Sequence, residues 1–545
     1  MDETGNKHMA TLEDSTERMI AFLRQPSAYP HRPPAVEIRQ THASVLAIAP
    51  PYVYKVKKHV NLGFLDFTRL SERKENCERE RRLNSRLCPE LYIGVLPIAS
   101  KDNRLFFGAE GRIVEYALQM RQLPEGFFLD QLLQSDQVTP ATLDLILQKL
   151  KRFYEEHPPA PSVSAYGEAE KVREVVEGNL IALKEHTGEI VQEASLEAVQ
   201  NYCARFFADN QALFEKRVQE QRIRDCHGDL HLDHIHIWQG KVCIYDCIEF
   251  NDRFRYIDVA SDMAFLAMDF DFHGRPDLAS YITSRLASLL HDPDLALLSD
   301  FYKCYRACVR AKVECITSQE PEVPAIERQR SREKARRYGS LALHYALFGS
   351  QPAVLVVCGR SGSGKSTIAG RLAELLGWEY VSSDITRKAL FDIPQHQRSS
   401  PEMRANLYAQ QVTDHVYQIL LNQTRYAVMN QRSIVVDASF GQPRHRALFG
   451  QGLSRAQVPF LFIEMQASDE TLRKRLAKRD KSRQVVSDAR FADFELLRQL
   501  YHEPNEVAPG QLLRINAEKA LGRIEKEILQ QLSVLIGKNR EQRGG

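Results

Sequence analysis

A glycine-rich stretch between a strand-like run and a helix-like run constrains this chain more than any other feature. It extends from Gly359 to Thr367 and fits the pattern G-x-x-x-x-G-K-[ST] of the phosphate-binding P-loop. Residues 354–358 before it are apolar and rich in valine, which predicts a buried parallel strand. After it, apolar residues recur at helical spacing, at Ile368, Leu372, Leu375 and Leu376. The order of strand, loop and helix predicts a nucleotide-binding α/β domain.

The loop predicts ATP and Mg²⁺ as cofactors. Backbone N–H groups in such a loop surround phosphate oxygens, and the N-terminus of the following helix adds positive potential. We expect Lys365 to reach the β- and γ-phosphates and Ser366 to give its hydroxyl to Mg²⁺. The other expected nucleotide-binding residues of the loop are Gly359, Ser361, Gly362, Ser363, Gly364 and Thr367.

Length and charge limit the classes of protein to consider. A chain of 545 residues is too long for one hydrophobic core, so at least two domains are expected. Its 73 basic and 71 acidic residues are nearly balanced, which gives no overall argument for nucleic-acid or membrane binding. It has no membrane-length apolar run, and its first eight residues are polar. The ten cysteines form no C-x-x-C pair, so we expect reduced thiols in a cytoplasmic protein.

The segment after the P-loop predicts a doubly wound parallel α/β domain over residues 352–538. Strand-like runs alternate with helical patterns, which is typical of such a sheet. These runs lie at residues 379–382, 433–436, 460–465 and 512–515.

Polar residues at the predicted strand ends resemble those of the small P-loop kinases, the group that includes shikimate-, gluconate- and polynucleotide-kinase-like enzymes. The D-x-x-R motif of that group falls on Asp384 and Arg387. The resemblance implies that Asp384 contacts the acceptor hydroxyl and that Arg387 holds an anionic part of the acceptor. It also implies that Arg475 and Arg479 belong to an arginine-rich lid that neutralises charge on the transferred phosphoryl group. Asp437 would hold Mg²⁺ through water. Taken singly, Asp384 also fits a helix cap and the lid also fits a solvated helix.

The N-terminal half begins with strand patterns and one helix. We expect a loose tail and a short helix over residues 1–34, strands at 43–49 and 52–57, and a helix from a Ser71 cap to about Leu87. On this helix Glu80 shares the face of the buried leucines. A buried carboxylate needs a cationic partner, and Lys55 is the natural candidate, although it also fits a solvated lysine run. Further strands follow near residues 92–98, 105–107 and 112–120, then a helix starting at Thr139-Pro140.

The segment from Cys226 to Ile235 carries a second motif, His227-Gly228-Asp229. Together with the strands and the Lys–Glu pair, it resembles the catalytic loop H-G-D-x-x-x-x-N of the aminoglycoside phosphotransferase family, which has a bilobal protein-kinase-like α+β fold. The resemblance covers about residues 35–340. It implies that Asp229 is the base or orienting carboxylate for an acceptor hydroxyl, that Asp246 binds Mg²⁺ with Glu249 as a second candidate, and that Asp262 braces the loop.

Two features depart from that family. The strand turn at Ala49-Pro50-Pro51 has no glycine, so the phosphate-covering loop is unlike that of a kinase. His234 stands where the family has an asparagine ligand to Mg²⁺, and imidazole is a poor ligand for this ion. This leaves open whether the domain transfers phosphate or only binds nucleotide. A different reading takes four histidines as a transition-metal cluster, although their spacing fits no closed zinc pattern: His227, His231, His234 and His236.

The two resemblances together are similar to fused proteins that join an aminoglycoside phosphotransferase domain to an ATP-binding domain. We expect a domain over residues 35–348, a boundary near 349–352 and a P-loop kinase domain over 352–538. The predicted function is ATP-dependent phosphotransfer to a small hydroxyl-bearing, anionic acceptor. The alternatives are an ATPase switch coupled to a non-catalytic kinase-like module and a kinase of nucleic-acid ends. The balanced charge and the lack of an aromatic–basic platform count against the latter.

Overall fold

The structure is a computed structural model. It describes residues 16–544 except 42, 62–65, 157, 189, 322 and 482–485, with side chains up to residue 535. The first residues of the predicted tail therefore lie outside the described residues. So does Arg483, another arginine of the predicted arginine-rich lid. The chain divides into an N-terminal unit, Met1–Val172 with Gln211–Ser299, and a P-loop unit, Arg173–Asn210 with Asp300–Gly545.

This division differs from the predicted boundary near residues 349–352. Helix α12 (Ala325–Phe348), which precedes that boundary, belongs to the P-loop unit. Its residues Leu343, Leu347 and Phe348 lie in the same buried cluster as Leu355 and Val357 of the first P-loop strand. The sequence shows an apolar helix end there, but not which core that end joins.

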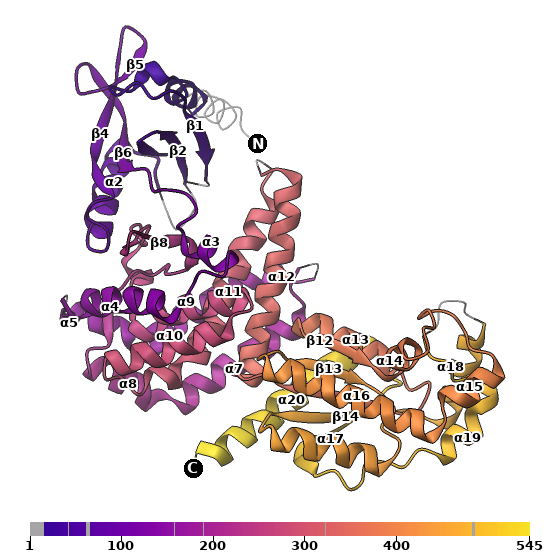
Figure 1. The fold of residues 1–545 in the computed structure, drawn as a ribbon. Coiled ribbons are helices and arrows are strands. Elements are labelled where there is room, and N and C mark those ends of the chain that lie inside the picture. Colours follow the sequence, from indigo (N-terminus) through magenta and orange to yellow (C-terminus); the bar gives the residue numbers. More distant parts are fainter. Residues whose placement is uncertain are drawn as a thin grey trace, which may run out of the picture. The chain divides into compact units, whose positions relative to one another are not determined.

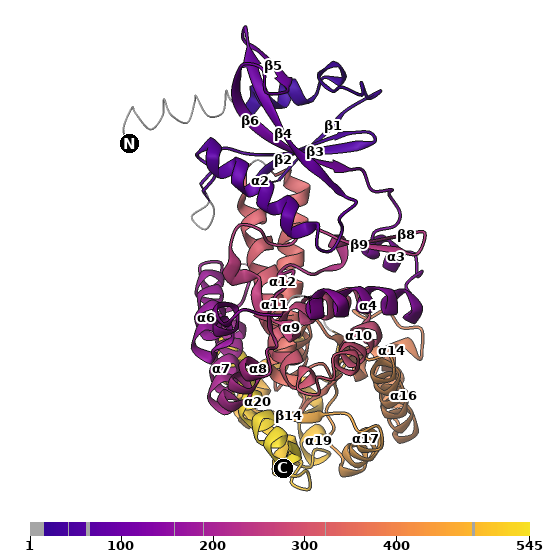
Figure 2. The same ribbon diagram turned by 90° about the vertical axis from the view of Figure 1, so that its left-hand side faces the viewer.

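The N-terminal unit begins with an antiparallel six-stranded sheet of order β1-β2-β3-β6-β4-β5 (Figure 2). The predicted strands are present, and β1 is an addition. The α2 helix starts at Leu70 with Arg69 as its N-cap residue, so the predicted Ser71 cap is wrong, and Ser71 lies inside the first turn. The strands are β1 (Glu37–Gln40), β2 (Ser44–Ala49), β3 (Tyr52–Lys57), β4 (Tyr92–Lys101), β5 (Arg104–Phe107) and β6 (Arg112–Arg121), with α2 (Leu70–Asn84) between β3 and β4.

Helices follow this sheet in the N-terminal unit. Helix α4 starts at Pro140, as the Thr139-Pro140 pair predicts, and buries its expected apolar face. The helices are α3 (Leu129–Gln134), α4 (Pro140–Glu156), α5 (Pro161–Ser164), α8 (Gln211–Gln219), α9 (Val259–Phe272) and α10 (Pro276–Leu289). The N-terminal unit also contains two antiparallel strand pairs: β7 (Ile223–Asp225) with β10 (Tyr256–Asp258), and β8 (Ile235–Trp238) with β9 (Lys241–Ile244). Helices α6 (Ala169–Lys184) and α11 (Leu295–Gln319) each continue into the other unit.

The P-loop unit contains a five-stranded parallel sheet of order β12-β13-β11-β14-β15 with helices around it (Figure 1). This confirms the predicted parallel α/β fold and its strand positions. The strands are β11 (Val354–Gly359), β12 (Glu379–Ser382), β13 (Ile434–Asp437), β14 (Phe460–Gln466) and β15 (Leu512–Asn516). The helices are α7 (Glu193–Asp209), α12, α13 (Lys365–Leu376), α14 (Ser383–Ala389), α15 (Pro401–Leu407), α16 (Gln410–Met429), α17 (Pro443–Arg455), α18 (Asp469–Asp480), α19 (Phe494–Gln499) and α20 (Leu521–Gly544).

The central strand β11 is buried on both faces, as its continuous apolar run predicts. Leu355 and Val357 pack in a cluster with residues of α12, α13 and α20. Val354 and Val356 pack on the opposite face with residues of α16 and α17. Two layers of helices therefore fix the strand whose end carries the P-loop.

A disulfide corrects the prediction that all ten cysteines are reduced thiols. Cys88 follows α2, and its partner Cys243 lies in β9, 155 residues further along the chain. Both belong to a small buried cluster with Tyr92 and Leu118. The large separation leaves no local spacing from which the sequence could reveal the pair. The other eight cysteines are buried and not disulfide-bonded.

Within the part of the chain that the structure describes, every helix is too short or too polar to cross a bilayer.

Candidate functional site

The P-loop connects the end of β11 to the start of α13. Gly359, Gly362 and Gly364 have φ angles of +138°, +88° and +92°, which residues other than glycine rarely adopt. A Cβ atom on Gly359 would lie 2.7 Å from the carbonyl oxygen of Met465. Glycine is therefore required there both by backbone conformation and by the close approach of β14.

The predicted nucleotide and magnesium residues meet at this end of the sheet. Asp437 ends β13 and pairs in register with Val357 of β11, beside the P-loop. Its Oδ2 accepts hydrogen bonds from Tyr380, at 2.9 Å, and from Ser382, at 3.3 Å. Burial raises the pKa of Asp437 above its ordinary value, and the nearby Lys365 ammonium opposes that rise.

Two buried oxygen atoms at this site fit a phosphate and a metal ion. Oγ of Ser363 and Oδ1 of Asp437 lie below the surface without a hydrogen-bond partner among the described residues. Buried polar atoms normally have partners, so each marks a place for a ligand atom or water. A hydroxyl, a carboxylate and an ammonium group close together form a donor set suited to Mg²⁺ and the phosphates of ATP.

The predicted acceptor residues lie on α14, which starts directly after β12. Asp384 is in its first turn, and the hydroxyl of Tyr408 lies 3.4 Å from Asp384 Oδ1. The buried Arg387 donates to the carbonyl of Leu407, at 2.6 Å, and to the hydroxyl of Thr413, at 3.2 Å. Arg387 thus joins the end of α15 to α16 in this structure, and its predicted contact with an acceptor anion stays a prediction.

The two predicted lid arginines lie on α18. Arg475 donates to the carbonyl of Ser363, at 3.1 Å, and to that of Ala517, at 2.7 Å, so it supports the P-loop backbone. Arg479 donates to the carbonyl of Ala489. Burial lowers the pKa of Arg479, and the Asp384 carboxylate opposes that shift. The sequence did not indicate the backbone contacts of Arg475, because they depend on how α18 packs on the loop.

The N-terminal unit contains a buried network of two lysines and three carboxylates. The predicted ion pair is present, with Lys55 Nζ 2.8 Å from Glu80, and Lys55 also lies 2.9 Å from Asp246. Lys57 was not predicted as part of the site. It lies 2.5 Å from Glu80 and 2.9 Å from Glu249. A sequence signal existed, because Lys55 and Lys57 alternate on one strand and therefore face the same side.

The charges of this network stabilise one another. Burial alone would raise the pKa of Asp246, but the ammonium of Lys55 and the imidazole of His234 hold that pKa well below its usual range. Burial likewise acts against the charged form of Lys55, but the Asp246 and Glu80 carboxylates raise its pKa above the ordinary value. The two predicted metal ligands Asp246 and Glu249 are therefore each already paired with a lysine.

Asp262 of α9 holds the loop that carries the second motif. Its carboxylate accepts from the backbone N–H of His227, at 3.0 Å, and of Gly228, at 2.9 Å. The hydroxyl of Tyr154 donates to the same carboxylate at 2.8 Å. Asp262 therefore braces this loop, as expected.

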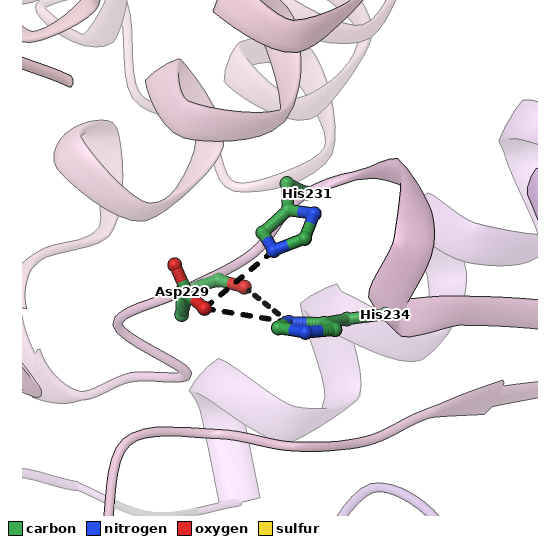
Figure 3. Close-up of side chains that lie close together, drawn as sticks. All are labelled: Asp229, His231 and His234. Carbon is green, nitrogen blue, oxygen red and sulfur yellow. Dashed lines mark hydrogen bonds and ion pairs between the residues drawn. The ribbon is translucent and has the colours of Figure 1, made fainter. Parts of the chain in front are cut away.

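Part of the predicted histidine cluster comes together. Figure 3 shows Asp229, His231 and His234 side by side, and one donor atom of each lies within 4.8 Å of the others. His227 and His236 lie outside this group, and each has Nε2 2.9 Å from a backbone carbonyl oxygen. His234 has one such contact too, from Nδ1 to the carbonyl oxygen of Asp229 at 2.9 Å, and its Nε2 remains for a ligand. Burial and the neighbouring His231 lower the pKa of His234 to about 4.

Comparisons with known proteins give relatives for both units. A family model described as an AAA domain matches residues 354–504. The uncharacterized protein Rv2004c of Mycobacterium tuberculosis is 31% identical over 416 residues, which cover 76% of this chain and 80% of the relative. The uncharacterized protein Mb2027c of Mycobacterium bovis matches with the same values. The aligned length exceeds either compact unit, so the similarity includes residues of both.

Two solved structures match the P-loop part. A gluconokinase from Sinorhizobium meliloti is 19% identical, covering 35% of this chain and 97% of its own, with a TM-score of 0.26. Kti12 from Chaetomium thermophilum, in complex with ADP-AlF3, is 18% identical, covering 34% of this chain and 98% of its own, with a TM-score of 0.27.

Proposed function

The chain belongs to the same family as the mycobacterial proteins Rv2004c and Mb2027c. Because its C-terminal part is a P-loop α/β domain, we propose that it is an ATP-dependent phosphotransferase. In this proposal the P-loop unit transfers the γ-phosphate of ATP to a small acceptor that carries a hydroxyl group. The acceptor is anionic, and Mg²⁺ accompanies the nucleotide.

The observation that carries the proposal is the meeting of nucleotide and acceptor residues at one end of the parallel sheet. Lys365 belongs to the P-loop, Asp437 lies beside the P-loop, and Asp384 follows strand β12, which pairs with β13. In parallel α/β sheets, ligands bind at the carboxyl ends of the strands. In this proposal the carboxylate of Asp384 orients the acceptor hydroxyl toward the γ-phosphate.

ATP turnover tests the proposal when purified protein is incubated with γ-labelled ATP and pooled hydroxyl-bearing metabolites. The protein carries Asp229→Ala, so that the proposed N-terminal site makes no product. We expect an acceptor-dependent labelled product, and a reduction of about 100-fold or more on adding Lys365→Ala, because Lys365 is expected to stabilise charge on the phosphates. Lys474→Ala is the matched control, since Lys474 is an exposed lysine of α18 whose ion-pair partner is Glu470. Equal losses in both variants would contradict the proposal.

The alternative outside the phosphotransferase class is an ATPase switch coupled to a non-catalytic kinase-like module. Its observable would be release of phosphate to water with no labelled acceptor. The placement of Asp384 beside Tyr408 and near Arg479 favours the kinase, because a switch that hydrolyses ATP needs no acceptor-facing carboxylate.

For the N-terminal unit we propose a protein-kinase-like domain of the aminoglycoside phosphotransferase type, which acts as a second phosphotransferase. The buried Lys55–Glu80 pair, the Lys55–Asp246 contact and the Asp262 brace support this proposal. A lysine fixed by a glutamate is the arrangement that positions phosphates in that fold. The test is product formation by Lys365→Ala protein: an acceptor-dependent product that disappears on adding Asp229→Ala supports two active sites. Its absence across the substrate pool would contradict the second.

A further inference from the structure

Asp229, His231 and His234 converge within one short segment of the N-terminal unit (Figure 3). The segment ends in a single 3-10 turn, Leu232–His234, which brings the two imidazoles together with ring centroids 3.9 Å apart. His231 is buried, at 5% relative exposure. Two nitrogen ligands and one oxygen ligand therefore meet at a partly enclosed position.

The separations between these side chains suit a shared ion. Oδ2 of Asp229 lies 3.5 Å from Nε2 of His231 and 3.6 Å from Nδ1 of His234. Hydrogen bonds between such atoms are shorter, at about 2.7–3.2 Å. Two ligands that each lie about 2.1 Å from a tetrahedral zinc ion are about 3.4 Å apart. The distance to His231 therefore matches two ligands around one ion. Nδ1 of His234 lies 2.9 Å from the backbone carbonyl oxygen of Asp229, which is a hydrogen-bond distance and leaves Nε2 as the ligand nitrogen of His234.

The surroundings hold the ligands in place. The backbone N–H of Leu232 donates to Asp269, at 3.0 Å, and the hydroxyl of Tyr245 donates to the carbonyl of Asp233, at 2.7 Å. Metal-binding histidines usually have an oxygen atom near the second ring nitrogen. His234 meets this condition, because its Nδ1 lies 2.9 Å from the backbone carbonyl oxygen of Asp229. For His231 the nearest carboxylate oxygen, Asp233 Oδ2, lies 3.7 Å from Nδ1, which is longer than a hydrogen bond.

From this geometry we propose that Asp229, His231 and His234 bind a divalent transition-metal ion of the zinc class. Nitrogen donors favour such ions over Mg²⁺, which prefers oxygen. Three protein ligands also leave a position for water or for a substrate oxygen. A carboxylate that binds through one oxygen keeps the other, so Asp229 still has an atom for an acceptor hydroxyl. The inference goes beyond both proposed phosphotransferase functions. It shares Asp229 with the proposed N-terminal site but rests only on the geometry of the three side chains.

Zinc binding by the full-length protein tests the inference without nucleotide or acceptor. The protein is treated with a chelator, dialysed and titrated with Zn²⁺ by calorimetry in excess Mg²⁺. We expect one site that His231→Ala and Asp229→Asn each weaken by about 100-fold or more, since even loss of a residue behind a ligand costs about 10–100-fold. The matched control is His236→Gln, a neighbouring histidine outside the cluster, which we expect to leave the affinity within about threefold.

Two results would overturn the inference: zinc affinity unchanged in both ligand variants, or an equal loss in His236→Gln. Because Asp229→Asn keeps the size of the side chain, it separates ligand loss from misfolding, and circular dichroism checks each variant. Co²⁺ provides an independent readout. Its visible absorption bands should appear on binding to wild-type protein and disappear in His231→Ala, and bands that persist there would place the metal elsewhere.

Discussion

At the scale of single residues, Asp384 separates acceptor chemistry from nucleotide binding. It lies in the first turn of α14, within 3.4 Å of the Tyr408 hydroxyl, and it contacts no P-loop residue in the described hydrogen bonds. We expect Asp384→Asn to lower kcat by about 100-fold or more while the Kd for ATP stays within about twofold, because it removes a group that orients the acceptor. Calorimetry with ATP and steady-state kinetics measure the two effects, and a weaker ATP affinity with unchanged kcat would place Asp384 in the nucleotide site.

His234 predicts a pH dependence of stability. Its pKa is about 4 in the folded protein and 6.5 ordinarily, because burial and His231 disfavour the charged form. Between these values the unfolded chain takes up a proton that the folded chain does not, so stability falls as the pH falls below 6.5. From about pH 7 to about pH 5 the loss should be about 2 kcal/mol.

Urea unfolding at both pH values, with a chelator present, measures this loss. His234→Asn should reduce it, because asparagine does not titrate, while Asp229, His227 and Asp246 remain around the site. An unchanged pH dependence in His234→Asn would show that other groups determine it.

At the scale of structural elements, the P-loop depends on glycine at Gly359. An added Cβ would lie 2.7 Å from the Met465 carbonyl at a φ of +138°. We expect Gly359→Ala to destabilise the P-loop unit by about 1–3 kcal/mol and to weaken ATP binding. Gly370→Ala is the matched control, since Gly370 lies in α13 with open space around its Cβ position, and alanine there should stabilise by up to about 1 kcal/mol. Denaturant unfolding compares the two, and equal effects would contradict this account.

The sequence predicted elements well where local pattern decides them. Strand β11 follows from its valine run, and α4 follows from Thr139-Pro140 and its apolar spacing. Prediction from the sequence failed where the structure depends on more than a local pattern. The Cys88–Cys243 disulfide joins residues 155 positions apart. Helix α2 starts at Leu70, and its N-cap residue Arg69 makes no side-chain capping hydrogen bond, so no capping residue in the sequence marks this start.

The candidate sites show the same limit. The Lys55–Glu80 pair was predictable because a buried carboxylate on a helix face needs a cation. Lys57 faces the same side of β3 as Lys55, so the sequence could indicate this lysine. Its partner Glu249 lies 192 positions away, and nothing local in the sequence could indicate that pairing. The three-residue cluster around His231 depends on a tight turn that selects two histidines out of four.

At the scale of the whole molecule, the chain combines two compact units that each contain charged residues suited to phosphate chemistry. Lys365 and Asp437 belong to one, and Lys55, Glu80 and Asp229 belong to the other. Because the mycobacterial relatives align over more residues than either unit contains, the similarity to them includes residues of both units. A two-unit chain need not unfold in a single step, so stability changes in variants are best assigned to the unit that contains the substitution.

The fate of the γ-phosphate tests the central claim most directly. Protein with Asp229→Ala, which disables the proposed N-terminal site, is incubated with γ-labelled ATP, Mg²⁺ and the acceptor pool, and label is measured in acceptor and in free phosphate. The account predicts that most label enters an acceptor and that adding Lys365→Ala reduces the transfer by about 100-fold or more. Label that appears only as free phosphate, whatever acceptor is present, would contradict the account and identify the P-loop unit as an ATPase.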